Sequence, residues 1–165
     1  MLSRVVSFAE RVSDAVDRAV TFLAVCTLFA MTVVITAQIV FRFFFTALSW
    51  SEELARYLMV WLTFLGASSG VKRGAHIAVT FAVSALPAGL KKWMAGLVYL
   101  LSLYFFCLVA FYGVKLMEFQ AYQVSAGLGV SMRYVYLSIP VGCSFCAVHL
   151  VAHFLRLLAG EGSLG

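Results

Sequence analysis

The adjacent carboxylates Glu52 and Glu53, followed by Arg56, are residues whose type and spacing could do chemistry. Residues three and four positions apart share one face of a helix, so both acids can pair with Arg56, and Arg42 lies just across a short connection. Two neighbouring carboxylates could also hold a proton or a cation. Sites that move ions normally lie near the bilayer midplane. We therefore favour a structural charge cluster or partner interface formed by Arg42, Trp50, Glu52, Glu53 and Arg56.

Three histidines, His76, His149 and His153, are the candidate ligands for a cofactor, and the last two lie one helical turn apart. A haem anchor needs two histidines that face each other from different helices, and His76 would have to supply the second. Interfacial histidines without a cofactor are far more common. We therefore expect no cofactor and no metal.

The four cysteines all lie inside hydrophobic segments, at Cys26, Cys107, Cys143 and Cys146. The last two form a C-x-x-C spacing, but one such pair without a second pair or a histidine at ligand spacing is weak evidence for a metal. We expect free, buried thiols. The sequence also contains no catalytic triad, phosphate-binding loop or dinucleotide-binding motif, so we expect no catalytic residues and no enzyme activity.

The elements that position these residues must lie in a membrane. Hydrophobic residues make up 64% of the chain, charged residues only 12%, and the mean hydropathy is +1.01. A helix needs about 20 apolar residues to cross a bilayer. The sequence predicts an all-α integral membrane protein, a single membrane domain over residues 1–165, with four transmembrane helices plus short interfacial amphipathic helices. The predicted spans are about 19–41, 54–71, 93–114 and 134–155.

Two further segments are predicted to lie at the membrane surface. Residues 1–18 carry charges on one face and an apolar stripe on the other, which is typical of a helix that lies on the membrane or docks against a partner. Residues 77–86 are apolar but too short to cross, and they begin after His76.

The second span presents Gly66 and Gly70 one turn apart, with small residues between them. Such a G-x-x-x-G step lets another helix backbone approach closely, so we expect these glycines to serve helix packing. Small-residue steps of this kind are common in membrane helices.

The net charge of +5 is best read as a topology signal, because there is no dense basic run of the kind that binds nucleic acid. If both termini are cytoplasmic, eight Lys and Arg residues lie on that side and four on the other. Positive residues concentrate on the cytoplasmic side of membrane proteins. We therefore expect a multi-pass protein of the bacterial inner membrane with both termini in the cytoplasm.

Several motifs taken together resemble one family, the small (Q, DctQ-type) membrane subunit of tripartite ATP-independent periplasmic (TRAP) transporters. They are RFFF at 42–45, WSEELARY at 50–57, WLTFLGA at 61–67 and KRGAHI at 72–77. The resemblance extends from about residue 34 to 87, and LSIPVG at 137–142 is similar to the family's fourth helix. One departure is Ser131-Met132-Arg133, where such proteins often carry a proline.

The resemblance implies a role in sodium-coupled secondary transport. In such systems a periplasmic binding protein delivers an organic acid, often a carboxylate or sialic acid, to a small and a large (M, DctM-type) membrane subunit. The large subunit carries the solute and sodium sites and moves as an elevator, while the small subunit braces it. The implied partners are therefore the large subunit, the binding protein and the lipid bilayer.

Two other functions remain open from the residues alone. A haem- or quinone-binding membrane anchor of a redox enzyme would show a Soret band in its visible spectrum. A four-helix exporter would need a carboxylate inside the first span, and none lies between Ala19 and Phe41.

Overall fold

The computed structural model describes residues 2–44, 46, 48–74 and 88–159, and within them the fold is almost entirely helical. The long helices are α1 (Leu2–Phe44), α2 (Ser49–Lys72), α4 (Ala88–Phe119) and α6 (Ser138–Leu158). The short elements are the 3-10 turn η1 (Gln120–Tyr122) and α5 (Arg133–Tyr136). Four helical stretches, with α5 and α6 forming one of them, are long and apolar enough to cross a membrane, which confirms the predicted fold class.

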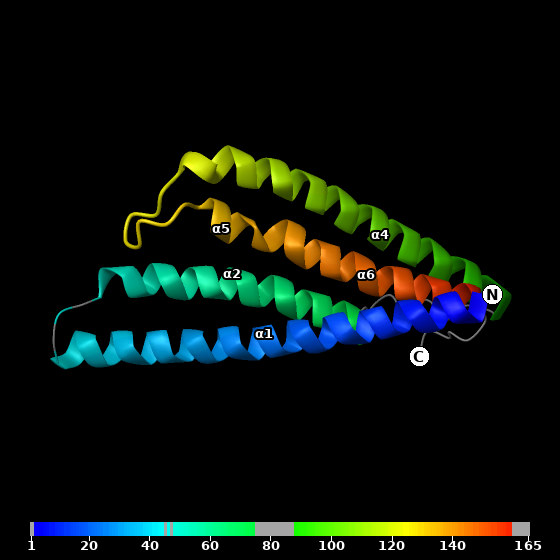
Figure 1. Ribbon diagram of the computed structural model, residues 1–165, viewed down its shortest axis with the longest axis horizontal. Helices are drawn as coiled ribbons and strands as arrows, with labels where there is room; N and C mark the ends of the chain where they lie inside the picture. Colours follow the sequence, from blue (N-terminus) through cyan, green and yellow to red (C-terminus); the bar gives the residue numbers. More distant parts are fainter. Residues whose placement is uncertain (1, 45, 47, 75–87, 160–165) are drawn as a thin grey trace.

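The helices form an open row rather than a closed bundle (Figure 1). Helix α1 contacts α2, α2 contacts α6, and α6 contacts α4, while α1 also reaches α6. Among the described residues, α4 makes no close approach to α1 or α2. Half of the apolar window of the α5–α6 stretch is buried, against 6% for α1 and for α4. Helix α6 is therefore the core, and α1 and α4 leave broad apolar faces uncovered.

Close packing in this row depends on glycines other than the predicted pair. A Cβ added at Gly142 of α6 would lie 2.6 Å from the Cβ of Phe64, so only glycine lets α6 approach α2 there. A Cβ at Gly113 of α4 would lie 2.8 Å from Ile139. These two glycines bring α2 and α4 against the central helix.

Helix α1 corrects the prediction of a separate surface helix over residues 1–18. It runs unbroken for 43 residues, because no glycine or proline interrupts it. At 1.5 Å per residue it is about 65 Å long, roughly twice the thickness of the hydrocarbon core. Its first turns therefore continue the span in line, and one of their faces docks on the chain itself.

The beginning of α1 and the end of α6 lie at one end of the row, which we call the network end (Figure 1). The start of α2 and the loop between α4 and α5 lie at the other, the loop end. The predicted interfacial segment 77–86 and His76 lie outside the described residues.

All four cysteines are free thiols in the described structure. Cys143 and Cys146 are buried in α6, as expected. Cys26 and Cys107 are exposed on the surface of the subunit, because the open row leaves the outer faces of α1 and α4 uncovered.

Candidate functional sites at the two ends of the helix row

At the loop end, Glu53 anchors the loop between α4 and α5. One carboxylate oxygen, Oε1, accepts a hydrogen bond of 2.7 Å from the Tyr57 hydroxyl. The other, Oε2, accepts the backbone N–H groups of Gly127 at 2.7 Å and Leu128 at 3.1 Å. A Cβ at Gly127 would lie 2.7 Å from Oε2, so any other residue there would displace the carboxylate. Glu53 thereby joins the start of α2 to a loop more than 70 positions away in sequence.

The loop itself forms a compact turn that suits this anchor. Ser125 N–H donates to the carbonyl of Val130 at 2.9 Å, and Gly129 N–H donates to the carbonyl of Ser125 at 3.1 Å. Gly129 has a φ of 68°, a left-handed conformation that favours glycine. The turn points the N–H groups of Gly127 and Leu128 at the carboxylate.

The other predicted members of the charge cluster are arranged differently from expectation. Gln38 Nε2 donates to Glu52 Oε1 at 3.2 Å and so joins α1 to α2. In the described structure no ion pair within 4.0 Å joins Arg42 or Arg56 to either glutamate. The predicted pairing is therefore not formed, because Glu53 is turned toward the loop while Glu52 and Arg56 are exposed. Whether these residues and Trp50, itself 39% exposed, form a partner interface stays a prediction.

The predicted packing glycines lie on an open face of α2. Gly66 is exposed, and a Cβ added there would meet no atom within 4 Å. Gly70, one turn further along, is half-buried. The described part of this chain does not fill the space at Gly66, and a packing role for the pair stays a prediction.

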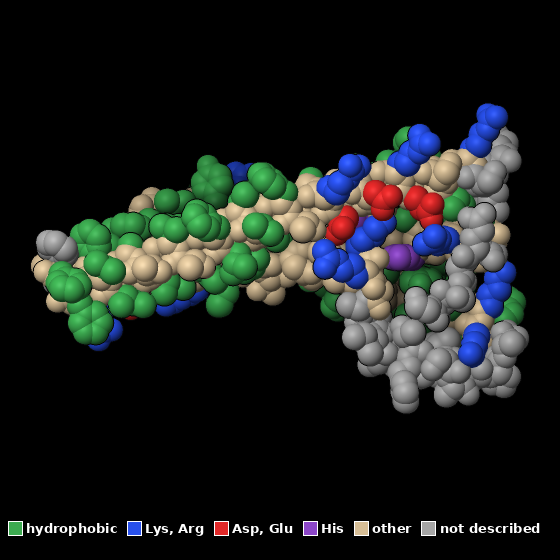
Figure 2. Space-filling view, turned by 90° about the horizontal axis from the view of Figure 1, so that it is seen from below, with side chains coloured by type: hydrophobic (Ala, Val, Ile, Leu, Met, Phe, Trp, Pro, Cys, Tyr) green, Lys and Arg blue, Asp and Glu red, His purple; other side chains and the backbone are tan. Residues whose placement is uncertain are grey.

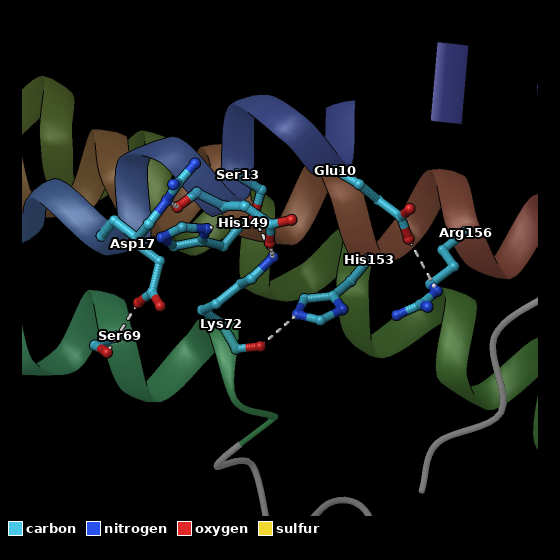
Figure 3. A network of polar contacts seen from close by, with 10 residues as sticks. Glu10, Ser13, Asp17, Ser69, Lys72, His149, His153 and Arg156 are labelled. Carbon is cyan, nitrogen blue, oxygen red and sulfur yellow. Dashed lines mark hydrogen bonds and ion pairs between the residues drawn. The ribbon is translucent and has the colours of Figure 1, made fainter. Parts of the chain in front are cut away.

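A second polar cluster, at the network end, joins three helices through Lys72 (Figure 3). The Lys72 ammonium lies 2.6 Å from Asp14 Oδ1 and donates to Ser13 Oγ at 3.0 Å. Ser13 Oγ in turn lies 2.7 Å from Nδ1 of His149. Because Lys72 sits on α2, the two acceptors on α1 and His149 on α6, this cluster fixes the start of α1 against both of its neighbours.

The chemistry of the donors sets the direction of these hydrogen bonds. An ammonium can only donate, so Ser13 Oγ accepts from Lys72. The Ser13 hydroxyl hydrogen can then point to Nδ1 of His149, which accepts it. This arrangement satisfies Ser13 Oγ and Nδ1 of a neutral His149 ring, whereas the buried Nε2 of His149 has no hydrogen-bond partner among the described residues. The cluster is thus a chain of hydrogen bonds that runs from Lys72 through Ser13 to His149. Ser13 and His149 are both fully buried.

Further contacts extend the cluster along the same end. Ser69 Oγ donates to Asp17 Oδ1 at 2.9 Å, and Arg156 Nε lies 3.0 Å from Glu10 Oε1. His153 Nε2 lies 3.1 Å from the backbone carbonyl of Lys72, and its ring stacks on Tyr99 of α4. The candidate ligands His149 and His153 therefore both contact other residues of the chain. The space-filling view shows charged side chains gathered at this end, while hydrophobic side chains cover the length of the row (Figure 2).

Sequence reasoning overlooked this cluster, although its signal is present. Glu10, Asp14 and Asp17 recur at spacings of four and three, and so do His149, His153 and Arg156. Each set forms one polar stripe on a helix. The pattern of residues 1–18 predicts a helix on the membrane or against another protein, but the structure turns its acidic side chains toward α2 and α6.

Comparison with known proteins adds independent information. The family described as "Tripartite ATP-independent periplasmic transporters, DctQ component" matches residues 31–160. The chain is 32% identical over 143 residues to the sialic acid TRAP transporter small permease protein SiaQ of Vibrio cholerae, which covers 81% of this chain and 80% of that protein. It is 31% identical over 120 residues to the C4-dicarboxylate TRAP transporter small permease protein DctQ of Rhodobacter capsulatus, which covers 72% of this chain and 51% of the relative.

A third relative is much longer than this chain. The sialic acid TRAP transporter permease protein SiaT of Haemophilus influenzae is 31% identical over 111 residues, which are 66% of this chain but only 18% of that protein. The chain therefore spans about a fifth of SiaT and about half of the Rhodobacter protein, but most of SiaQ.

Proposed function

This chain belongs to the DctQ family of TRAP transporter components, and on that premise we propose that it is the small subunit of a sodium-coupled importer for a carboxylate-bearing solute. Family membership makes it a transporter permease component and not an enzyme. The observation that carries the proposal is the similarity to SiaQ, because it extends over about four fifths of both chains.

The names of the relatives support the proposed solute class. Their names give sialic acid for two of them and a C4-dicarboxylate for another. Both kinds of solute carry carboxylate groups. These names support a carboxylate-bearing organic acid as the solute, delivered by a periplasmic binding protein.

Within the transporter, the subunit acts as a scaffold for the large membrane subunit. Its polar clusters lie at the two ends of the row, where they join its own helices. Its outer helices α1 and α4 expose large apolar side chains along the spans, among them Phe29, Phe105 and Phe111. Broad uncovered apolar faces suit a large membrane partner or lipid.

We further propose that the protein lies in the bacterial inner membrane with both termini in the cytoplasm. The network end, where α1 begins and α6 ends, carries eight Lys and Arg residues, at Arg4, Arg11, Arg18, Lys72, Arg73, Lys91, Lys92 and Arg156. The excess of basic residues at that end supports a cytoplasmic location.

Transport in reconstituted vesicles tests this function. The small subunit, the large subunit and the binding protein are combined, and uptake of labelled sialic acid and of a labelled C4-dicarboxylate is measured with and without an inward sodium gradient. Sodium-dependent uptake of one solute, lost when the small subunit is omitted, is expected. Equal uptake without the small subunit would contradict the scaffold role. A Soret band that persists through purification would favour the haem-anchor alternative.

A further inference from the structure

We propose that the outward face of the first turns of α1 is a docking surface for an acidic amphipathic helix of another protein. We call this face the outer stripe. Its apolar residues follow one another at alternating spacings of three and four: Val5, Phe8, Val12, Ala15, Ala19 and Phe22. A line of arginines runs beside them, at Arg4, Arg11 and Arg18. This surface is distinct from the transport function, and its role does not depend on the solute.

The two faces of this part of α1 have opposite roles. On the inner face, Val6, Ser13 and Val20 are 2%, 0% and 1% exposed, because they are covered by the rest of the chain. On the outer stripe, Phe8 is 69% exposed and Phe22 is 67% exposed. Residues seven apart lie on nearly the same side of a helix, so both faces are continuous lines. The described chain covers one of them and leaves the other open.

The outer stripe has the spacing of a helix–helix seam. Alternating steps of three and four residues are the a and d positions of a heptad, which pack into a neighbouring helix. The arginines recur every seven residues, at the position before each a residue, which is position g. All three are exposed. Charged g positions pair with the partner helix and select it.

The charged residues of the outer stripe are all arginines, because the acids of the same segment lie off the stripe and contact residues of α2 and α6. Glu10 pairs with Arg156, Asp14 with Lys72, and Asp17 accepts a hydrogen bond from Ser69. A helix that covers the stripe therefore needs acidic residues beside its own apolar seam. Complementary charges at these positions favour that partner over neutral or basic ones.

The position of the stripe favours a protein over lipid as its occupant. Asp14 pairs with Lys72, the last residue of α2, so the residues before it extend beyond the end of that helix. At 1.5 Å per residue, Val5 lies about 14 Å further along the axis than Asp14. The headgroup layer is only roughly 5–8 Å thick on each side of a bilayer. With the end of α2 at the edge of the hydrocarbon core, Val5 would therefore lie in water unless protein covers it.

A second copy of this chain is a poor occupant for the same reason of charge. The residues on the other edge of the stripe, Ala9 and Val16, are apolar. A parallel copy would place arginines against these side chains, and an antiparallel copy would place arginines against arginines. Like charges across a seam disfavour pairing. The stripe up to Phe22 also lies outside the stretch that matches the family, residues 31–160.

Peptide binding to the full chain in nanodiscs of neutral lipid tests the proposal. The probe is a fluorescent helical peptide of three heptads with Leu at a and d and Glu at e and g, and its counterpart carries Lys at e and g. We expect saturable binding of the acidic peptide by fluorescence anisotropy and none of the basic peptide. Phe8→Asp should weaken binding at least tenfold. Replacing Arg4, Arg11 and Arg18 together with Glu should switch the binding preference from the acidic to the basic peptide. Because the basic peptide gains binding, loss of the fold cannot explain this result.

The matched control replaces three exposed basic residues at the same end with Glu. They lie outside α1 and are Arg73, Lys91 and Lys92. This variant should bind the acidic peptide as the unchanged protein does. Equal loss in the control, or no binding of the acidic peptide, would overturn the proposal. Two further results would also overturn it: disulfide-linked dimers of a Phe8→Cys variant in membranes would identify a second copy, and loss of affinity for anionic vesicles in the outer-stripe variants alone would identify lipid.

Discussion

Ser13, near the start of the first helix, lies 2.7 Å from Nδ1 of His149 on the last helix, 136 positions later in the chain. Both side chains are fully buried, and Lys72 of α2 donates to the same Ser13 oxygen. One hydroxyl group therefore holds three helices together at the network end. These contacts hold the first turns of α1 against the rest of the subunit, while the other face of those turns stays exposed.

Replacing Ser13 with alanine should destabilise the subunit. The change leaves Nδ1 of His149 buried without a partner and removes an acceptor of Lys72. An unsatisfied buried polar group costs about 1–3 kcal/mol. A lower melting temperature in detergent is expected. Ser7→Ala is the matched control, because Ser7 is exposed and, within the described residues, its hydroxyl donates to the nearby carbonyl of Arg4 alone. Equal melting temperatures for the two variants would argue against a stabilising role of the hydrogen bonds that join Lys72, Ser13 and His149.

Changing Glu53 to glutamine should loosen the loop between α4 and α5. The glutamine side chain would keep the shape, but it would lose the charge that strengthens the bonds from Gly127 and Leu128. Hydrogen bonds to charged groups contribute about 1.5–3 kcal/mol, so faster hydrogen exchange by roughly tenfold or more is expected at these two amides. Glu52→Gln, which lacks a loop contact, is the control.

The same Glu53 variant separates an anchor from an ion site. We expect it to assemble with the large subunit and to keep the sodium dependence of uptake in reconstituted vesicles unchanged. A shifted sodium dependence in a normally assembled complex would make the carboxylate an ion ligand and would contradict the scaffold assignment.

Gly142→Ala should destabilise the subunit, whereas Gly66→Ala should not. The added methyl group at Gly142 would lie 2.6 Å from the Cβ of Phe64, so α6 would have to move away from α2. Overpacking of this kind typically costs about 1–3 kcal/mol. At Gly66 the methyl group would meet nothing within 4 Å. Thermal unfolding of the two variants measures the difference, and similar losses in both would contradict this packing scheme.

Reversing Arg56 to glutamate should impair assembly with the large subunit while leaving the isolated subunit folded. Arg56 is exposed and forms no ion pair in the described structure, so its loss removes no such contact within the chain. The reversal instead gathers three acids within two helical turns, with Glu52 and Glu53. Co-purification with the large subunit measures the effect. Arg133→Glu provides a control, and undiminished co-purification of the Arg56 variant would exclude this face from the interface.

The orientation of the chain is tested with reporter fusions. A reporter after Gly165 should be active in the cytoplasm, and one inserted between Gln120 and Gly129 should be active in the periplasm. The expectation rests on the excess of Lys and Arg at the network end. Activity of both fusions in the same compartment would refute a four-span topology, and a reversed result would invert the membrane orientation.

The sequence by itself determined that this is a four-span, all-helical membrane protein and a member of the DctQ family. These properties depend on local composition and on short motifs, because lipid requires long apolar helices whatever their arrangement. It also identified Glu53 as a residue that needs a partner. It could not identify that partner, since Gly127 is 74 positions away and only the fold brings its N–H group to the carboxylate.

Only the tertiary structure decided which faces of the helices meet. Spacing showed that Glu53 and Arg56 could pair, but the loop supplies better donors and turns Glu53 away from Arg56. Spacing also showed that residues 1–18 have two faces, without indicating that the acidic one docks on Lys72 and Arg156. Periodicity gives the direction of a side chain around one helix axis, whereas its partner depends on the rotation and offset of a second helix, and those are set by close contacts such as Gly142 against Phe64.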